Sequence, residues 1–160
     1  MRFSHCPTGA VGRPALFTSL LFSVCLAWSM PAGADEAEVD QQIEELLGEH
    51  QLFKDTIADL QERVTNEDWV AVSAFIAYPI TVTINGRKKT LRSAEAFEPL
   101  AADIITPEIA EVIVNQDYGS LFVNSDGIMF GDGQVWMNGI CLDDTCSTFE
   151  PKIITIQDAQ

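Results

Sequence analysis

Between residues 39 and 64 the apolar positions recur at the spacing of an α-helix. The members of this stripe are Val39, Ile43, Leu46, Phe53, Ile57, Leu60 and Val64. Steps of three and four residues place such side chains along one side of a helix, and acidic residues occupy the other sides. His50 fills the one gap in the stripe, and Gly48 either kinks the helix or divides it into two. The pattern predicts an acidic helical segment over residues 35–64.

This apolar stripe has two interpretations. In the first, the helix packs by one face on its own domain and leaves its acidic side chains in solvent; residues 35–68 hold 12 acidic and 2 basic residues. In the second, the stripe is the seam of a coiled-coil homodimer with His50 inside it. Both interpretations give His50 a packing role rather than that of a general base, because helical phase places it among apolar side chains.

A second helix is predicted to begin at residues 65–68. A capping side chain followed by acidic residues suits the exposed N–H groups and the positive dipole at a helix start. The helix would carry toward the core Trp69, Val72, Phe75 and Ile76. Because a residue before proline is disfavoured in helical conformation, Tyr78-Pro79 is predicted to end this helix.

Residues 78–92 carry the clearest local signal, that of a β-hairpin. Asn85-Gly86 separates two alternating segments, and both residues tolerate the positive φ of a type I′ turn. Such a turn pairs Ile84 with Arg87, Val82 with Lys89, and Ile80 with Leu91. The apolar members of these pairs are expected to pack inward at the base, while the charged tip reaches solvent because unpaired buried charge is costly.

Further helices and strands are predicted downstream of the hairpin. Ser93 caps a short helix that reaches Leu100, and Thr106 starts another with Pro107 at its first position, where the missing N–H costs nothing. The predicted strands cover residues 120–123, 128–130, 134–142 and 145–156. We expect tight turns at residues 124–127 and 131–133, since neither segment has the full ligand set of a calcium or phosphate loop.

The last two strands predict a disulfide. With Asp143-Asp144 as the turn, Cys141 lies opposite Cys146 and Trp136 lies opposite Pro151. Directly opposed residues are about 4.5–5.5 Å apart, a separation that a disulfide spans. A metal-binding pair is the competing interpretation, but soft-metal sites usually need four ligands and His50 is the only histidine after residue 34.

Residues 1–34 have the pattern of a secretory signal peptide. Arg2 and Arg13 give the segment a positively charged start, and an apolar run of 14 residues follows them. Ala32-Gly33-Ala34 is a small-residue cleavage site. The run is shorter than the roughly 20 residues of a membrane span, although a retained anchor is the alternative. We therefore predict export to the periplasm or the extracellular space, after cleavage behind Ala34, and no stable membrane anchor.

The charge balance limits the classes of partner. The full chain has a net charge of −15, and residues 35–160 carry 24 acidic and 7 basic residues, a net charge of −17. So acidic a chain is a poor partner for nucleic acids or anionic membranes. Four of the seven cations lie together at the hairpin: Arg87, Lys88, Lys89 and Arg92. They form either a solvated tip or a docking surface for an anion or an acidic partner.

Three segments, in their order along the chain, carry a resemblance to a known family. They are Asp68-Trp69, Tyr78-Pro79-Ile80 and the aromatic-rich block Phe122–Trp136. Over residues 50–157 the chain resembles the nuclear transport factor 2-like, or ketosteroid isomerase-like, superfamily and its small secreted bacterial members. The resemblance implies a single α+β domain, residues 65–160, whose curved antiparallel sheet wraps around helices as a cone. An acidic N-terminal helix precedes this domain.

Members of this family commonly hold a pocket at the open end of the cone. The residues predicted to line it here are Trp69, Tyr78, Phe122, Met129 and Trp136. We expect an exported, non-enzymatic binding protein that takes a small apolar ligand in this pocket or a cationic protein on its acidic surface. The alternative is an isomerase- or dehydratase-type enzyme inside the cone. Neither Tyr78 nor Tyr118 matches the oxyanion donor of such enzymes, so no catalytic residue, cofactor or metal is assigned.

Overall fold

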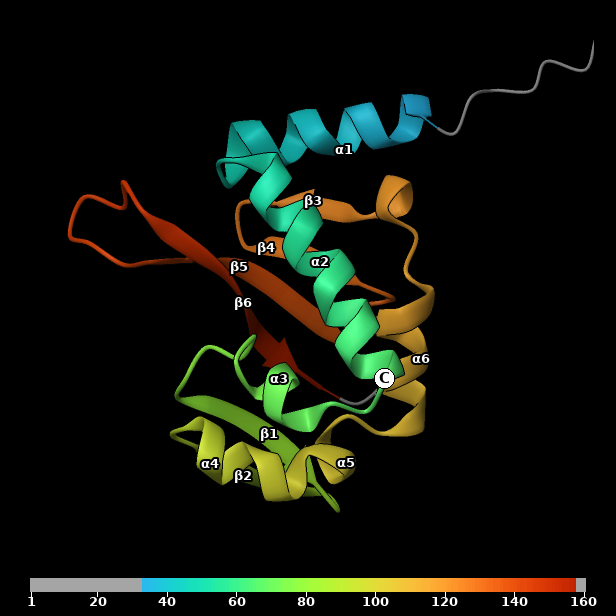
Figure 1. The fold of residues 1–160 in the computed structure, drawn as a ribbon, viewed down its shortest axis with the longest axis vertical. Coiled ribbons are helices and arrows are strands. Elements are labelled where there is room, and N and C mark those ends of the chain that lie inside the picture. Colours follow the sequence, from blue (N-terminus) through green and yellow to red (C-terminus); the bar gives the residue numbers. More distant parts are fainter. Residues whose placement is uncertain (1–32, 158–160) are drawn as a thin grey trace, which may run out of the picture.

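Two antiparallel sheets and a set of helices make up residues 33–157, the part of the chain described by the computed structural model (Figure 1). The helices are α1 (Gly33–Leu46), α2 (His50–Thr65), α3 (Trp69–Ser73), α4 (Ala94–Phe97), α5 (Ala101–Ile104) and α6 (Pro107–Asn115). Two 3-10 turns are η1 (Glu98–Leu100) and η2 (Tyr118–Ser120). The strands are β1 (Ile80–Ile84), β2 (Arg87–Leu91), β3 (Phe122–Asn124), β4 (Gly127–Phe130), β5 (Val135–Cys141) and β6 (Phe149–Ile156).

The sheets establish the α+β class. One is the hairpin β1-β2, and the other is an open four-stranded meander in the order β3-β4-β5-β6. In Figure 1, α1 lies at one end of the molecule and the hairpin with α3, α4 and α5 lies at the other, while α2 runs between them from α1 to α3 and α6. The predicted signal sequence falls outside the described residues except for its last two positions.

The predicted apolar stripe is divided between two helices at Gly48. This residue has φ +109°, a left-handed conformation that ends α1 after Leu46. His50 begins α2 instead of lying in the stripe: its Nδ1 is 2.8 Å from Glu44 Oε2, and its side chain is 36% exposed. The prediction of a packed His50 is therefore wrong, because the break at Gly48 shifts the helical phase. Leu46 is likewise exposed.

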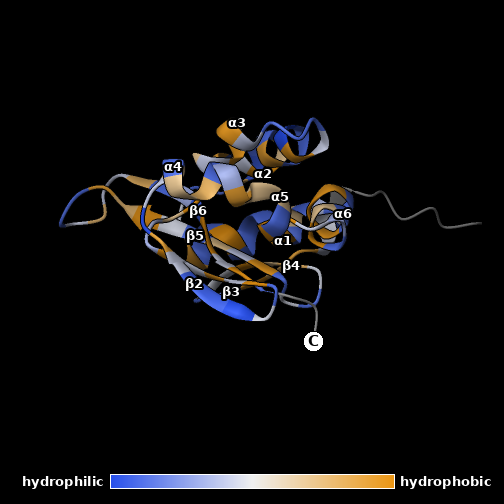
Figure 2. Cartoon of the chain, turned by 90° about the horizontal axis from the view of Figure 1, so that it is seen from below, coloured by the Kyte–Doolittle hydropathy of each residue, from blue (hydrophilic) through white to orange (hydrophobic). Residues whose placement is uncertain are grey.

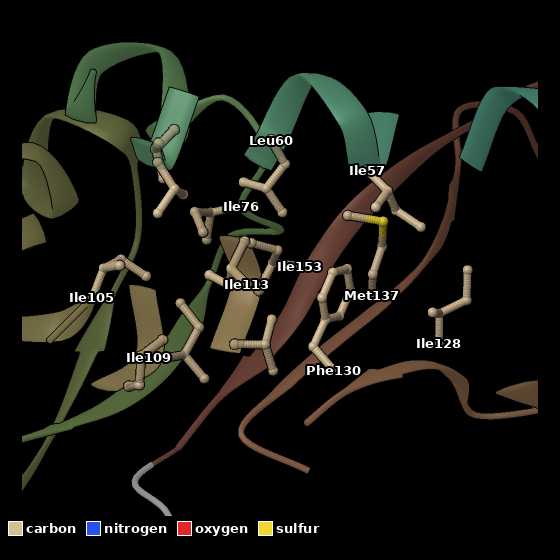
Figure 3. Close-up of a cluster of buried hydrophobic side chains, with 14 of the residues drawn as sticks. Ile57, Leu60, Ile76, Ile105, Ile109, Ile113, Ile128, Phe130, Met137 and Ile153 are labelled. Carbon is tan, nitrogen blue, oxygen red and sulfur yellow. The ribbon is translucent and has the colours of Figure 1, made fainter. Parts of the chain in front are cut away.

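The rest of the stripe packs on the chain's own domain. α2 crosses the inner face of the four-stranded sheet, as Figure 3 shows for Ile57 and Leu60 beside Met137 and Phe130. Buried members of the stripe are Val39, Ile43, Phe53, Ile57, Leu60 and Val64. Since these side chains already fill the core, the stripe does not form a coiled-coil seam.

α3 is shorter than predicted. Asp68 caps it as expected, accepting a hydrogen bond from the Ala71 backbone N–H at 3.1 Å. The helix ends at Ser73, well before Tyr78-Pro79, because the following backbone pairs with β6. The Ala77 N–H donates to the Ile153 carbonyl at 2.9 Å, and the Ile153 N–H donates to the Phe75 carbonyl at 2.6 Å. The sheet edge thus replaces the hydrogen bonds that a longer helix would have made.

The β1-β2 hairpin and its register are confirmed. Ile84 pairs with Arg87, Val82 with Lys89, and Ile80 with Leu91. Asn85 and Gly86 have φ values of +51° and +73°, as a type I′ turn requires. Ile80, Val82 and Leu91 are buried, whereas residues 85–90 are exposed. The predicted cap at Thr106 is also confirmed, since its Oγ1 accepts from the Ile109 N–H at 3.4 Å. Ser93 precedes α4 as predicted, but its side chain makes no capping hydrogen bond.

The disulfide is confirmed, but the predicted strand register is wrong. Cys141 and Cys146 are bonded with their Cα atoms 4.7 Å apart. Cys141 nevertheless pairs with Phe149 across the ladder, and Trp136 pairs with Thr155 rather than Pro151. Two features account for the difference. The loop extends over residues 142–148, and a bulge shifts the register between Trp136 and Met137.

A single carboxylate organises the long β5-β6 loop. Asp143 accepts hydrogen bonds from backbone and hydroxyl groups of Thr145, Ser147 and Thr148, at 2.6–3.1 Å. These bonds hold the pKa of Asp143 far below its usual range. In Figure 1 the loop lies at the tip of an arm that extends beyond the rest of the molecule.

Candidate binding surfaces

Three of the predicted pocket residues form a row on the outer face of the four-stranded sheet. Phe122 pairs with Met129, and Met129 pairs with Trp136, so their side chains point to the same side. The neighbouring inward row consists of Val123, Ile128, Met137 and Ile153. The Phe122 and Trp136 rings meet edge to face with centroids 6.4 Å apart, and Phe122 is 51% exposed. The outer row faces away from the side that α2 covers.

Trp69 lies in a separate hollow between two pairs of helices. The hollow is open to solvent, has a volume of about 410 Å³ and lies between the end of α2 with α3 and the pair α5-α6. Its apolar lining comes from Val64, Trp69, Ala102, Ile105, Pro107, Ala110 and Val114. We call it the Trp69 groove. Its volume falls within the roughly 300–1,000 Å³ of small-molecule and side-chain sites.

Two acidic residues, both exposed, line the Trp69 groove. Glu67 follows the C-terminus of α2, and Glu111 lies on α6. Glu67 has φ +51°, an uncommon left-handed conformation for a residue with a side chain. It occupies the position after the helix where glycine is usual, while the Asp68 N–H donates to the Arg63 carbonyl at 3.0 Å. The backbone turn after α2 therefore places Glu67 in the lining of this groove.

No lysine or arginine lines the Trp69 groove. Arg63 precedes the lining residue Val64 in the sequence, but its guanidinium pairs with other carboxylates. Its Nε is 2.9 Å from Asp59 Oδ1, and its Nη1 is 3.8 Å from Asp68 Oδ2. The groove thus combines an aromatic ring and apolar walls with two carboxylates that no lining cation neutralises. This arrangement suits a ligand that has a positive charge and an apolar stem.

Tyr78 is partly buried against the core and does not line this groove. Its hydroxyl donates to the Ser73 carbonyl at 3.1 Å, and Ser73 Oγ donates to the Val70 carbonyl at 2.7 Å. Burial, with the Glu98 and Glu95 carboxylates nearby, raises the pKa of Tyr78 to about 12. Tyr78 therefore stays protonated at neutral pH and links α3 to the start of β1.

Raising the pH above 10 is expected to destabilise the fold through Tyr78. The folded chain keeps this phenol proton up to about pH 12, whereas an unfolded chain releases it near pH 10. The contribution to the free energy of unfolding is complete below pH 10 and is lost as pH rises toward 12. Absorbance at 295 nm, with Tyr78→Phe as the control, would follow the titration. Titration of both tyrosines near pH 10 in the folded chain would contradict this placement.

Tyr118 holds α1 in place. Its hydroxyl donates to Asp40 Oδ1 at 2.7 Å, and Lys54 Nζ lies 4.5 Å from the centre of its ring. Lys54 also bonds Glu36 Oε2 at 2.7 Å. Burial and the Asp40 hydrogen bond raise the pKa of Tyr118. The hydroxyl groups of both tyrosines thus make structural hydrogen bonds. The carboxylate of Asp103 on α5 belongs to an exposed residue and lies outside these hydrogen bonds.

The four hairpin cations stand apart from the acidic residues. Lys54, Arg63 and Lys152 each lie within 4 Å of a carboxylate, whereas among residues 33–157 none of the hairpin cations has an ion-pair partner. Those cations are Arg87, Lys88, Lys89 and Arg92, and all are exposed. Figure 2 shows β2 as a hydrophilic strand at the margin of the molecule. The hairpin and the acidic helix α1 lie at opposite ends of the molecule (Figure 1).

Sequence reasoning found only part of these surfaces. It named Trp69 and the basic hairpin, but it missed Glu67, Glu111 and the α6 side of the groove. No sequence signal marks those residues, since a glutamate after a helix does not reveal a left-handed conformation, and an acidic residue on a helix such as α6 is usually solvated.

Comparisons with known proteins identify no relative. The chain matches no protein-family model, no curated protein and no solved structure. Within residues 33–157, no helix has both the length and the apolar character needed to cross a membrane. The same residues contain no cluster of three or more His, Cys, Asp or Glu side chains able to hold a metal ion.

Proposed function

We propose that this is an exported, non-enzymatic binding protein whose partner is a cationic protein, and that the Trp69 groove is its recognition site. One observation carries the proposal: Glu67 and Glu111 line the same apolar hollow as the partly buried Trp69, and no cation is in the lining. A lysine or arginine side chain of the partner would place its alkyl stem against the apolar wall. Its charge would lie near the carboxylates and the Trp69 ring.

The acidic helices support the same partner class. α1 and α2 carry exposed carboxylates at Asp35, Glu38, Glu45, Asp55 and Glu62. Carboxylates grouped on one part of a surface attract a cationic protein over long range and raise its association rate, most strongly at low salt. The exposed carboxylates of α1 and α2 would therefore speed the encounter with the partner, and the Trp69 groove would supply the specific contact.

Export and the family assignment are part of this proposal. The disulfide between Cys141 and Cys146 fits an oxidising compartment, where such bonds form and persist. The open four-stranded sheet crossed by α2 is compatible with the curved, cone-like sheet of the nuclear transport factor 2-like superfamily. That superfamily includes binding proteins as well as enzymes, so the function is argued from the groove and not from the fold.

The groove can be tested with a defined cationic probe. A synthetic ten-residue peptide of alternating lysine and leucine is titrated against the chain at low and high salt, with tryptophan fluorescence as the readout. The variant Glu67→Gln/Glu111→Gln is expected to weaken binding about tenfold, because it removes both groove charges. The control Asp55→Asn/Glu62→Gln removes the same charge from α2 outside the groove and should weaken binding less than threefold.

Two outcomes would overturn the groove as the recognition site. If both double variants weaken binding equally, attraction depends on net charge alone. If a glutamate–leucine peptide binds as tightly as the lysine–leucine peptide, the groove recognises apolar surface and the cationic partner class is wrong.

A further inference from the structure

A second hollow lies at the basic hairpin, which is at the opposite end of the molecule from α1 (Figure 1). Its volume is about 520 Å³, and its lining consists of Ile84, Asn85, Arg87, Lys88, Lys89 and Leu100. It lies between the tip of β1-β2 and the 3-10 turn η1, which contributes Leu100. We call it the hairpin hollow.

Strand register places two cations on the apolar side of this hollow. Ile84 pairs with Arg87, and Val82 pairs with Lys89, so these four side chains share one face of the hairpin. Val82 is buried in the core, whereas Ile84 at the hairpin tip and Leu100 on η1 remain partly exposed. The hollow therefore has an apolar floor, Ile84 and Leu100, beside the charged groups of Arg87 and Lys89.

The charges of the hairpin hollow have no partner within the described chain. Neither Arg87 nor Lys89 lies within 4 Å of a carboxylate of residues 33–157, although the chain has far more acidic than basic residues. Cations on an edge strand also discourage pairing with another strand. Protection of an edge strand needs only charged side chains that point outward. It does not explain why partly exposed apolar side chains, Ile84 and Leu100, line the same hollow as the cations.

We propose that the hairpin hollow binds a small carboxylate that carries an apolar chain. Arg87 would pair with the carboxylate through two parallel hydrogen bonds, and Lys89 would add a point charge from the same face. The apolar chain would cover Ile84 and Leu100 and remove their exposed surface from water. A small inorganic anion would gain nothing from these two side chains, and the chain's net negative charge opposes a polyanion. This site is independent of the Trp69 groove.

Octanoate is the probe for this site, with acetate and octan-1-ol as comparison ligands. Backbone amide shifts of the ¹⁵N-labelled chain locate and quantify binding in one measurement. We expect octanoate to shift the amides of residues 84–89 and Leu100 saturably. Acetate, which lacks the chain, and octan-1-ol, which lacks the charge, should bind at least tenfold more weakly.

Two variants of exposed cations distinguish binding in the hairpin hollow from general attraction to the positive charge of the hairpin. Arg87→Gln/Lys89→Gln should weaken octanoate binding at least tenfold, while Arg92→Gln, which changes a hairpin cation outside the hollow lining, should leave it within twofold. The amide spectra themselves show that each variant remains folded. The proposal is overturned if octan-1-ol binds as tightly as octanoate, if the double variant binds normally, or if the shifts centre on Trp69. Binding to phosphatidylglycerol vesicles without binding to octanoate would equally overturn it in favour of a membrane surface.

Discussion

Replacing Phe53 by alanine is expected to lower the free energy of unfolding by about 3–5 kcal/mol. Phe53 lies on the face of α2 that crosses the sheet, and it is fully buried. Its ring centroid is 5.7 Å from that of Phe149 on β6, so one side chain joins the helix to the last strand. Truncation removes this contact and leaves a cavity that the surrounding helix and strand cannot fully close.

Phe122→Ala is the matched control for this substitution. Phe122 is also a phenylalanine, but it lies on the outer face of the sheet that α2 crosses, and about half of it is exposed. Its truncation should cost roughly 1 kcal/mol or less, since little packing is lost. Urea unfolding followed by circular dichroism gives both values. Equal losses for the two variants would show that α2 does not pack across the sheet as described.

Gly127→Ala is expected to cost about 3 kcal/mol or more, through backbone strain and overlap together. Gly127 begins β4 with φ +134°, a conformation that is essentially restricted to glycine. A Cβ atom at this position would overlap the backbone carbonyl oxygen of Met137 on β5. Because the obstacle is backbone rather than a flexible side chain, the β4-β5 pairing must separate to admit the methyl group.

Gly86→Ala tests the same substitution without the overlap. Gly86 also has a positive φ, +73°, but a Cβ atom there would meet no other atom within 4 Å. The expected cost is about 1 kcal/mol, from the left-handed conformation alone. Thermal unfolding of the two variants under the same conditions gives the comparison. If Gly127→Ala is no more destabilising than Gly86→Ala, the close approach of β4 and β5 is absent in solution.

Features that depend on neighbouring residues were predictable from the sequence. The Asn85-Gly86 turn has backbone requirements that few other dipeptides meet, so both the hairpin and its register followed from it. Thr106-Pro107 marked a helix start for a similar reason. The disulfide was predicted from the only two cysteines after residue 34, and it survives an incorrect register because the loop returns Cys146 toward Cys141.

Features that depend on contacts between distant segments were not predictable. The end of α3 is decided by the hydrogen bonds that residues 75–77 make with β6, about 75 positions later. The β5-β6 register depends on a loop that Asp143 organises and on a bulge near Trp136. Neither the loop length nor the bulge has a local signature as specific as Asn-Gly, so a two-residue turn fitted the sequence equally well.

The candidate sites show the same division. The strong acidity, the group of four cations at one hairpin and the large aromatic residues follow from composition and spacing alone. Packing of distant segments, in contrast, sets Phe122, Met129 and Trp136 on the outer face of a sheet and Trp69 in a groove with Glu67 and Glu111. It likewise brought Leu100 beside the hairpin tip. A hollow forms where elements far apart in the chain pack together, and that packing minimises exposed apolar surface over the whole domain rather than over any local segment.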